Sequence, residues 1–151
     1  MPLAGEKIRA SDITRVVAKA TDITSNVGPT SGTTPLDVIT APAFTPPDTN
    51  RRYMLVFHCR SIDTSVTGDQ FVVEFKEGAT ILNGESYWSV GTGAGDKSGM
   101  TFIAYVDGPT AASHTYKVTI TRTAGTGTAT VDAGGTFPIQ LAVHYVGKVT
   151  E

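Results

Sequence analysis

The sequence predicts an all-β protein: an antiparallel β-sandwich or jelly roll of about eight strands with an extended N-terminal arm. From about residue 50 onward, apolar and polar residues alternate with a period of two, as in half-buried strands. Clusters of glycine, proline, asparagine and aspartate separate the alternating segments. Only 17% of the residues are charged, below the ~25% typical of soluble domains, and threonine is the commonest residue. This composition suits flat β surfaces.

The first fifty residues predict an arm followed by the first strands. Residues 1–12 are expected to order against another surface, with Lys7, Ile8, Arg9 and Arg15 as anchors; a terminus without fixed structure is the alternative. Residues 13–151 form a single sandwich domain, long enough to be stable without disulfides. Its first segment, ITRVVAKAT (13–21), favours a strand over a short helix capped by Ser11 or Asp12 because its residues are largely β-branched. In LDVITAPAF (36–44), Pro42 indicates an edge strand or a bulge.

Four later segments alternate most clearly: RRYMLVFHCR (51–60), QFVVEFK (70–76), TYKVTITR (115–122) and FPIQLAVHYV (137–146). Their apolar residues are predicted to face the core, and the residues between them to face water or a partner. The predicted inward residues are Tyr53, Leu55, Phe57, Cys59, Phe71, Val73, Phe75, Tyr116, Val118, Ile120, Phe137, Ile139, Leu141, Val143 and Tyr145.

The turns follow from short polar and glycine-containing pairs. Asn83-Gly84 is the strongest hairpin signal, because both residues tolerate a positive φ. Further turns are predicted at Gly68-Asp69, at Asp107-Gly108-Pro109 and at Ala133-Gly134-Gly135. The segment TAGTGTATV (123–131) is rich in glycine, and only its end is expected to pair.

The loop GTGAGDKSG (91–99) has the glycines and lysine of a phosphate-binding loop but not its context. Asp96 stands directly before Lys97, where a phosphate loop requires glycine, and its carboxylate would repel phosphate. The flanking segments alternate like strands, whereas a phosphate loop leads into a helix. We therefore expect a loop that joins two antiparallel strands and binds no nucleotide.

Catalytic and metal-binding patterns are not found in the sequence, and we expect no enzymatic activity, no cofactor and no metal. The only cysteine, Cys59, lies within an apolar segment and is expected to be a buried, unreactive thiol. His58, His114 and His144 lack ligand spacing and are interpreted as surface or interface residues, although His58 and His144 would approach if their strands were neighbours. Ser61-Ile62-Asp63 is interpreted as a cap or turn.

Charge and hydropathy exclude two classes of partner. The net charge of −2 and the pI near 5.9 argue against a nucleic-acid binder, which usually carries an excess of basic residues. The N-terminus lacks the apolar stretch of a secretory signal, and no apolar run approaches the ~18 residues of a membrane span. We expect the protein to fold in a cytoplasm.

Three aromatic residues suggest a possible ligand or receptor surface. Tyr87 and Trp88 precede the loop at 91–99, and Tyr105 follows it. Exposed aromatic rings on a β-sandwich can stack on sugars. The alternative, which we favour, is that Trp88 belongs to the core or to a subunit interface, where aromatic residues are also common.

Three segments resemble a known family. The opening MPLAGEKIRASDITR resembles the M-x-L-A-G-x-x-I-R-A-S-D start of small β-sandwich structural proteins of tailed bacteriophages of actinobacteria. FTPPDTNRRYMLVF resembles their F-T-x-x-x-x-R-R-Y strand entry, and FPIQLAVHYVG their closing P-x-x-L-x-V-x-Y-x-G strand. The resemblance extends from Gly5 to Gly147, and the loop at 91–99 has no counterpart in it.

The resemblance implies a trimeric virion protein without catalysis, assembled in the host cytoplasm. Within that class the small size and the anchor-like N-terminus favour a capsid decoration protein that binds the major capsid protein of the assembled head. The alternatives are a minor tail or tail-tip protein that contacts neighbouring tail proteins and the host surface, and a carbohydrate-binding module. Outward strand faces, including Val56 and His144, are the expected trimer interface.

Overall fold

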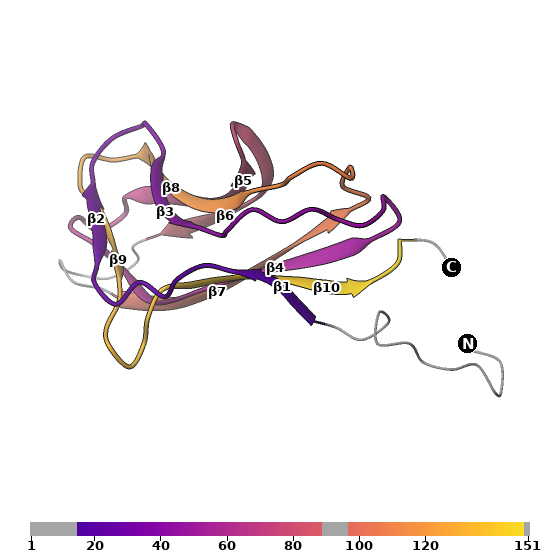
Figure 1. The fold of residues 1–151 in the computed structure, drawn as a ribbon. Coiled ribbons are helices and arrows are strands. Elements are labelled where there is room, and N and C mark those ends of the chain that lie inside the picture. Colours follow the sequence, from indigo (N-terminus) through magenta and orange to yellow (C-terminus); the bar gives the residue numbers. More distant parts are fainter. Residues whose placement is uncertain (1–14, 89–96, 150–151) are drawn as a thin grey trace, which may run out of the picture.

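The computed structural model describes residues 15–88 and 97–149, which form two stacked antiparallel sheets (Figure 1). This confirms the predicted all-β sandwich. The predicted arm, residues 1–12, lies outside the described residues, and so does most of the loop at 91–99. Residues 15–88 and 97–149 contain no helix long and apolar enough to cross a membrane.

The sandwich has ten strands. Their bounds are β1 (Arg15–Lys19), β2 (Val27–Thr30), β3 (Leu36–Thr40), β4 (Arg52–Thr64), β5 (Gln70–Glu77), β6 (Thr80–Trp88), β7 (Lys97–Asp107), β8 (Tyr116–Ala124), β9 (Ala129–Asp132) and β10 (Gln140–Gly147). One sheet has the order β1-β10-β4-β9-β2, with β7 on the other edge of β4. The second sheet has the order β3-β8-β5-β6.

The strands pair in a nested series that defines a jelly roll. β5 pairs with β6, β4 with β7, β3 with β8, β2 with β9 and β1 with β10, all antiparallel. The chain is therefore one long hairpin rolled into two layers, the arrangement of a jelly roll. The short strands β2 and β9 extend the sheet along the second half of β4. They account for the difference between the predicted eight strands and the ten observed.

The core lies between the sheets and contains the predicted inward residues with one exception. The inward side chains of β4, β5, β8 and β10 are buried, and the rings of Phe75 and Phe102 stack with centroids 4.5 Å apart. Phe137 is 57% exposed, because it lies in a turn where its backbone bonds Gly134, ahead of the first residue of β10. The prediction for Phe137 was wrong.

The hairpin predicted at Asn83-Gly84 lies elsewhere. These two residues are inside β6, where Gly84 pairs with Glu74. The chain reverses at Gly78 instead, whose φ of 57° is the left-handed conformation that favours glycine. β5 alternates between buried and half-buried residues as far as Phe75 and ends at Glu77, directly before Gly78.

Two further predictions about connections need correction. Ser61 is not a cap or turn residue: it lies in β4, and its hydroxyl donates a buried hydrogen bond to Asp132 at 3.0 Å. β6 and β7, which flank the loop at 91–99, do not pair with each other in the strand pairings of the described residues. The two strands belong to different sheets, because β7 pairs with β4 and β6 with β5.

The predicted turn at Gly68-Asp69 joins two connections that each lead from one sheet to the other, β4 to β5 and β8 to β9. The buried carboxylate of Asp69 accepts hydrogen bonds from the backbone N–H groups of Thr126 at 3.2 Å and Gly127 at 2.6 Å, between β8 and β9. A Cβ on Gly125 or Gly127 would overlap this carboxylate, which explains the glycine-rich sequence there.

We expect Asp69→Ala to lower the free energy of unfolding by about 1–3 kcal/mol, because buried N–H donors lose their acceptor. Urea unfolding measures the change. Asp69→Asn keeps one acceptor oxygen and should recover part of the loss. An Asp69→Ala variant as stable as the wild type would show that the carboxylate does not hold the two connections together.

Cys59 is buried, as predicted, on the inward face of β4. Burial raises the pKa of its thiol to about 11. At pH 8 about one thiol in a thousand is then ionised, since each unit below the pKa lowers the thiolate fraction tenfold. We expect native protein to resist a thiol reagent such as DTNB, whereas protein in denaturant reacts fully. Rapid labelling of the native protein at pH 8 would contradict this account of Cys59.

Candidate interaction surface

The outer face of the larger sheet carries an apolar stripe. Its members are the outward side chains of four adjacent strands: Val16, Met54, Val56, Ile103, Tyr105, Ala142 and His144. Three of them are strongly exposed for apolar residues: Val16 at 52%, Ile103 at 43% and Tyr105 at 60%. The others are half-buried between their neighbours. The alternation of β4 explains the stripe, because the residues between its members fill the core.

The strand register places the stripe in two rows across the sheet. One row runs from Val16 on β1 through His144 and Met54 to Tyr105 on β7. The next row contains Ala142, Val56 and Ile103. Side chains opposite each other on neighbouring strands have Cβ atoms about 4.5–5.5 Å apart, so each row is continuous.

Polar groups border the stripe at both ends. Beyond the first row, Arg52 donates two hydrogen bonds to Asp107, at 2.6 Å and 2.8 Å. Hydrogen bonding from Arg52 lowers the pKa of the exposed Asp107 carboxyl. At the other end, Nδ1 of His58 lies 3.0 Å from the Thr101 hydroxyl. An apolar centre with a polar rim is the anatomy of a protein–protein interface.

No sequence pattern predicted these borders, because the residues that pair there are distant along the chain. Arg52 and Asp107 are separated by 55 positions and meet only through the pairing of β4 with β7. The outward alternation of β4 and β10 did predict that Val56 and His144 share a face.

The histidines are arranged differently from the prediction in two respects. β4 and β10 are neighbours, but His58 pairs with Gln140 and His144 with Met54. Four residue steps therefore separate the two imidazoles along the strands, or about 13 Å. Within residues 15–88 and 97–149, no cluster of His, Cys, Asp and Glu has the arrangement of a metal site.

His114 is buried rather than at the surface. Its Nδ1 lies 2.6 Å from Oε1 of Glu77, and its Nε2 lies 2.9 Å from the carbonyl oxygen of Thr110. Its backbone also exchanges two hydrogen bonds with Phe44. His114 therefore holds the connection before β8 against the segment that follows β3, a structural position that its sequence context did not reveal.

The residues predicted as an aromatic ligand surface do not meet at the loop. Tyr105 lies eight positions from Lys97, the first residue of β7, which is about 27 Å in a strand. Tyr87 and Trp88 end β6 in the other sheet, where their backbones pair with β5. Their side chains lie outside what the structure describes. Tyr105 belongs instead to the apolar stripe.

Of the predicted arm anchors, only Arg15 is among the described residues. It is exposed at the start of β1, beside the stripe residue Val16. Lys7, Ile8 and Arg9 lie outside the described residues.

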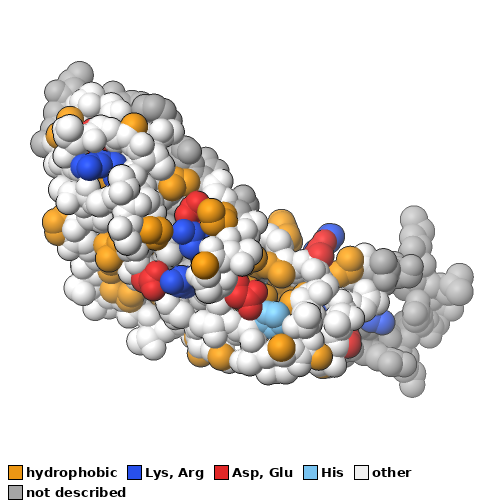
Figure 2. Space-filling model, turned by 90° about the horizontal axis from the view of Figure 1, so that it is seen from above, with side chains coloured by type: hydrophobic (Ala, Val, Ile, Leu, Met, Phe, Trp, Pro, Cys, Tyr) orange, Lys and Arg blue, Asp and Glu red, His pale blue; other side chains and the backbone are white. Residues whose placement is uncertain are grey.

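The outer face of the second sheet is polar and differs from the stripe. Lys76 lies 2.8 Å from Glu74, and Lys117 lies 2.8 Å from Asp37. Figure 2, which views the molecule from above this sheet, shows basic and acidic side chains next to one another. The two faces of the sandwich are therefore chemically distinct, and the apolar stripe is the better candidate for protein contact.

The nested strands and the exposed stripe define a jelly-roll β-sandwich with one apolar sheet face. No protein-family model matches the chain, and no curated protein matches it. The solved structures that match include two of infectious bursal disease virus: the Gx strain at 14% identity and the Gt strain at 15%. Each match has a TM-score of 0.44 and covers 99% of this chain. This chain spans 41% and 43% of the length of those chains, respectively. At TM-scores below 0.5 these matches do not bear on function.

Proposed function

We propose that the protein is a non-enzymatic structural component of a bacteriophage particle, a capsid decoration protein that binds the assembled head as a trimer. The observation that carries this proposal is the apolar stripe on the outer face of the larger sheet, across strands β1, β10, β4 and β7. Val16, Ile103 and Tyr105 are exposed there in the isolated chain, and a neighbouring copy would remove them from water.

The segments that resemble actinobacteriophage virion proteins support the same proposal. The opening segment and the closing strand carry that resemblance, and the closing strand, β10, contributes Ala142 and His144 to the stripe. Copies packed around a closed axis would bury the stripe. The major capsid protein is the proposed second partner. A protein that binds only the assembled shell stabilises that shell by mass action.

Residues 1–12 are the proposed anchor to the shell. They contain Lys7 and Arg9, which suit an acidic neighbour. We propose no nucleic-acid or membrane partner.

Cosedimentation with phage particles that lack this protein tests the proposal. The full chain should pellet with the particles, and a variant without residues 2–12 should stay in the supernatant while keeping its β-sheet circular dichroism. A full chain that does not bind the particles would contradict the decoration role. A truncated variant that binds as well as the full chain would contradict the anchor.

A further inference from the structure

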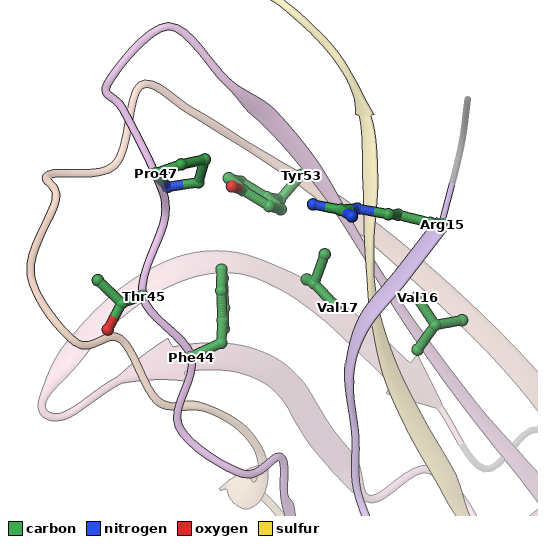
Figure 3. Close-up of a pocket in the computed structure, with 7 residues that line it drawn as sticks. All are labelled: Arg15, Val16, Val17, Phe44, Thr45, Pro47 and Tyr53. Carbon is green, nitrogen blue, oxygen red and sulfur yellow. The ribbon is translucent and has the colours of Figure 1, made fainter. Parts of the chain in front are cut away.

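A cavity of about 300 Å³ opens beside the start of β1. One wall is β1 itself, and the opposite wall is the segment around residues 44–47 that leads toward β4. Figure 3 shows Val17 and Phe44 directed into the space between these walls, with Tyr53 above them in this view. The cavity lies where the edge of the larger sheet meets the chain leaving the smaller one.

The lining suits one large apolar side chain. The rings of Phe44 and Tyr53 lie 5.1 Å apart between centroids and form an aromatic surface, and Val17 and Pro47 add aliphatic contact. A volume of about 300 Å³ is at the lower limit of small-molecule sites. An aromatic or large aliphatic side chain fills such a space more readily than a cofactor does.

The cavity also contains a cation without an acidic partner. Arg15 lines it, and Figure 3 shows the guanidinium directed toward Tyr53. Other cations at this end of the molecule are paired: Arg51 lies 2.9 Å from Asp48, and Lys19 lies 3.1 Å from Asp22. Among the described residues, none of the ion pairs includes Arg15. A carboxylate entering the cavity would meet an unpaired guanidinium.

The strand beside the cavity is a sheet edge. β1 pairs with β10 on one side, and no other described strand pairs with it. Its register shifts between Val16 and Ala18, and Val17 is directed into the cavity. A further strand laid along this edge would place every second side chain toward the cavity. Peptides recognised in this way gain affinity from main-chain hydrogen bonds and specificity from side-chain pockets.

We propose that this edge and cavity bind an extended acidic segment of a partner protein, which pairs with β1, inserts an aromatic side chain against Phe44 and Tyr53, and places a carboxylate on Arg15. The aromatic and acidic residues of that segment stand two positions apart, because residues i and i+2 of a strand share a face. The unpaired charge of Arg15 selects an acidic segment over a neutral one. The proposal does not depend on the proposed anchoring role of residues 1–12.

A synthetic peptide tests the proposal: acetyl-Thr-Thr-Phe-Thr-Glu-Thr-Thr-amide, titrated into the ¹⁵N-labelled full chain. We expect saturable shifts of the backbone amides of β1 and of residues 44–47. Arg15→Gln should raise the Kd about tenfold, the loss of one charge-assisted contact. The same peptide with Gln in place of Glu should bind the wild type about tenfold more weakly, and should bind Arg15→Gln as well as the Glu peptide does.

Two matched variants distinguish binding at this site from a general effect of charge and from misfolding. Arg60→Gln removes an exposed arginine of β4 that does not line the cavity, and should leave the Kd unchanged. Thr45→Trp fills the cavity from its exposed rim and should abolish the shifts. The proposal is overturned if neither peptide gives saturable shifts, if the shifts lie away from β1 and residues 44–47, or if Arg15→Gln and Arg60→Gln weaken binding equally.

Discussion

Val56→Asp is expected to leave the protein folded and to dissociate its assembled form into monomers. Val56 is at the centre of the apolar stripe, between Ala142 and Ile103. A carboxylate there would lose its hydration when a neighbouring copy covers the face, with no cation of the stripe to receive it. We expect association to weaken by at least about 2 kcal/mol, or about thirtyfold in Kd. Sedimentation equilibrium measures the mass of each form, for which one chain contributes 15.8 kDa.

Ile81→Asp is the matched control, because Ile81 is also an exposed aliphatic residue in a strand but belongs to the other sheet. It should keep the mass of the wild type. A Val56→Asp variant that remains assembled would place the subunit interface elsewhere on the surface. Equal dissociation by both variants would show a general effect of added charge.

Phe57→Ala, one residue further along β4, is expected to destabilise the fold of the single chain, whereas Val56→Asp weakens association. Phe57 is fully buried and pairs in register with Leu141 on β10 and Phe102 on β7. Removing its ring leaves a cavity and should lower the free energy of unfolding by about 3–5 kcal/mol. This is a large share of the about 5–15 kcal/mol by which most domains are stable. Denaturant unfolding measures the loss.

Phe137→Ala makes the same substitution at an exposed ring and should change the free energy of unfolding by less than about 0.5 kcal/mol. Comparable losses at Phe57 and Phe137 would contradict the assignment of Phe57 to the core and of Phe137 to an exposed turn. Adjacent residues of β4 thus test separate claims: Phe57 reports on the core, and Val56 reports on the partner surface.

The alternation of residues in the sequence predicted the fold class and most of the core. In β4, Tyr53, Leu55 and Phe57 face inward as expected, because a half-buried strand must separate its apolar side from its exposed side. The same alternation predicted Cys59 as buried. It failed at Phe137, where the apolar pattern begins before the strand does.

The sequence pattern could not predict which strands pair with each other. Nested pairs such as β1 with β10 join residues more than a hundred positions apart, and alternation does not indicate which strands become neighbours. For this reason Tyr105 was grouped with the loop at 91–99, its neighbour in sequence, although it is aligned with Met54. The hairpin at Asn83-Gly84 was misplaced because Gly78 offered an earlier turn.

The cavity beside β1 was not predicted for the same reason. The structure places Arg15, one of the predicted arm anchors, beside Phe44 and Tyr53, residues of two later segments. The position of Arg15 beside the aromatic cavity could be predicted only if the register of β1 on β10 were known.

The most direct test of the central claim is the copy number of this protein in purified particles of the proposed phage, by quantitative mass spectrometry against the major capsid protein. A decoration protein should be present at a copy number of the same order as the shell protein itself. A few copies per particle would contradict decoration and favour a tail protein. Absence from the particle would contradict a virion role altogether.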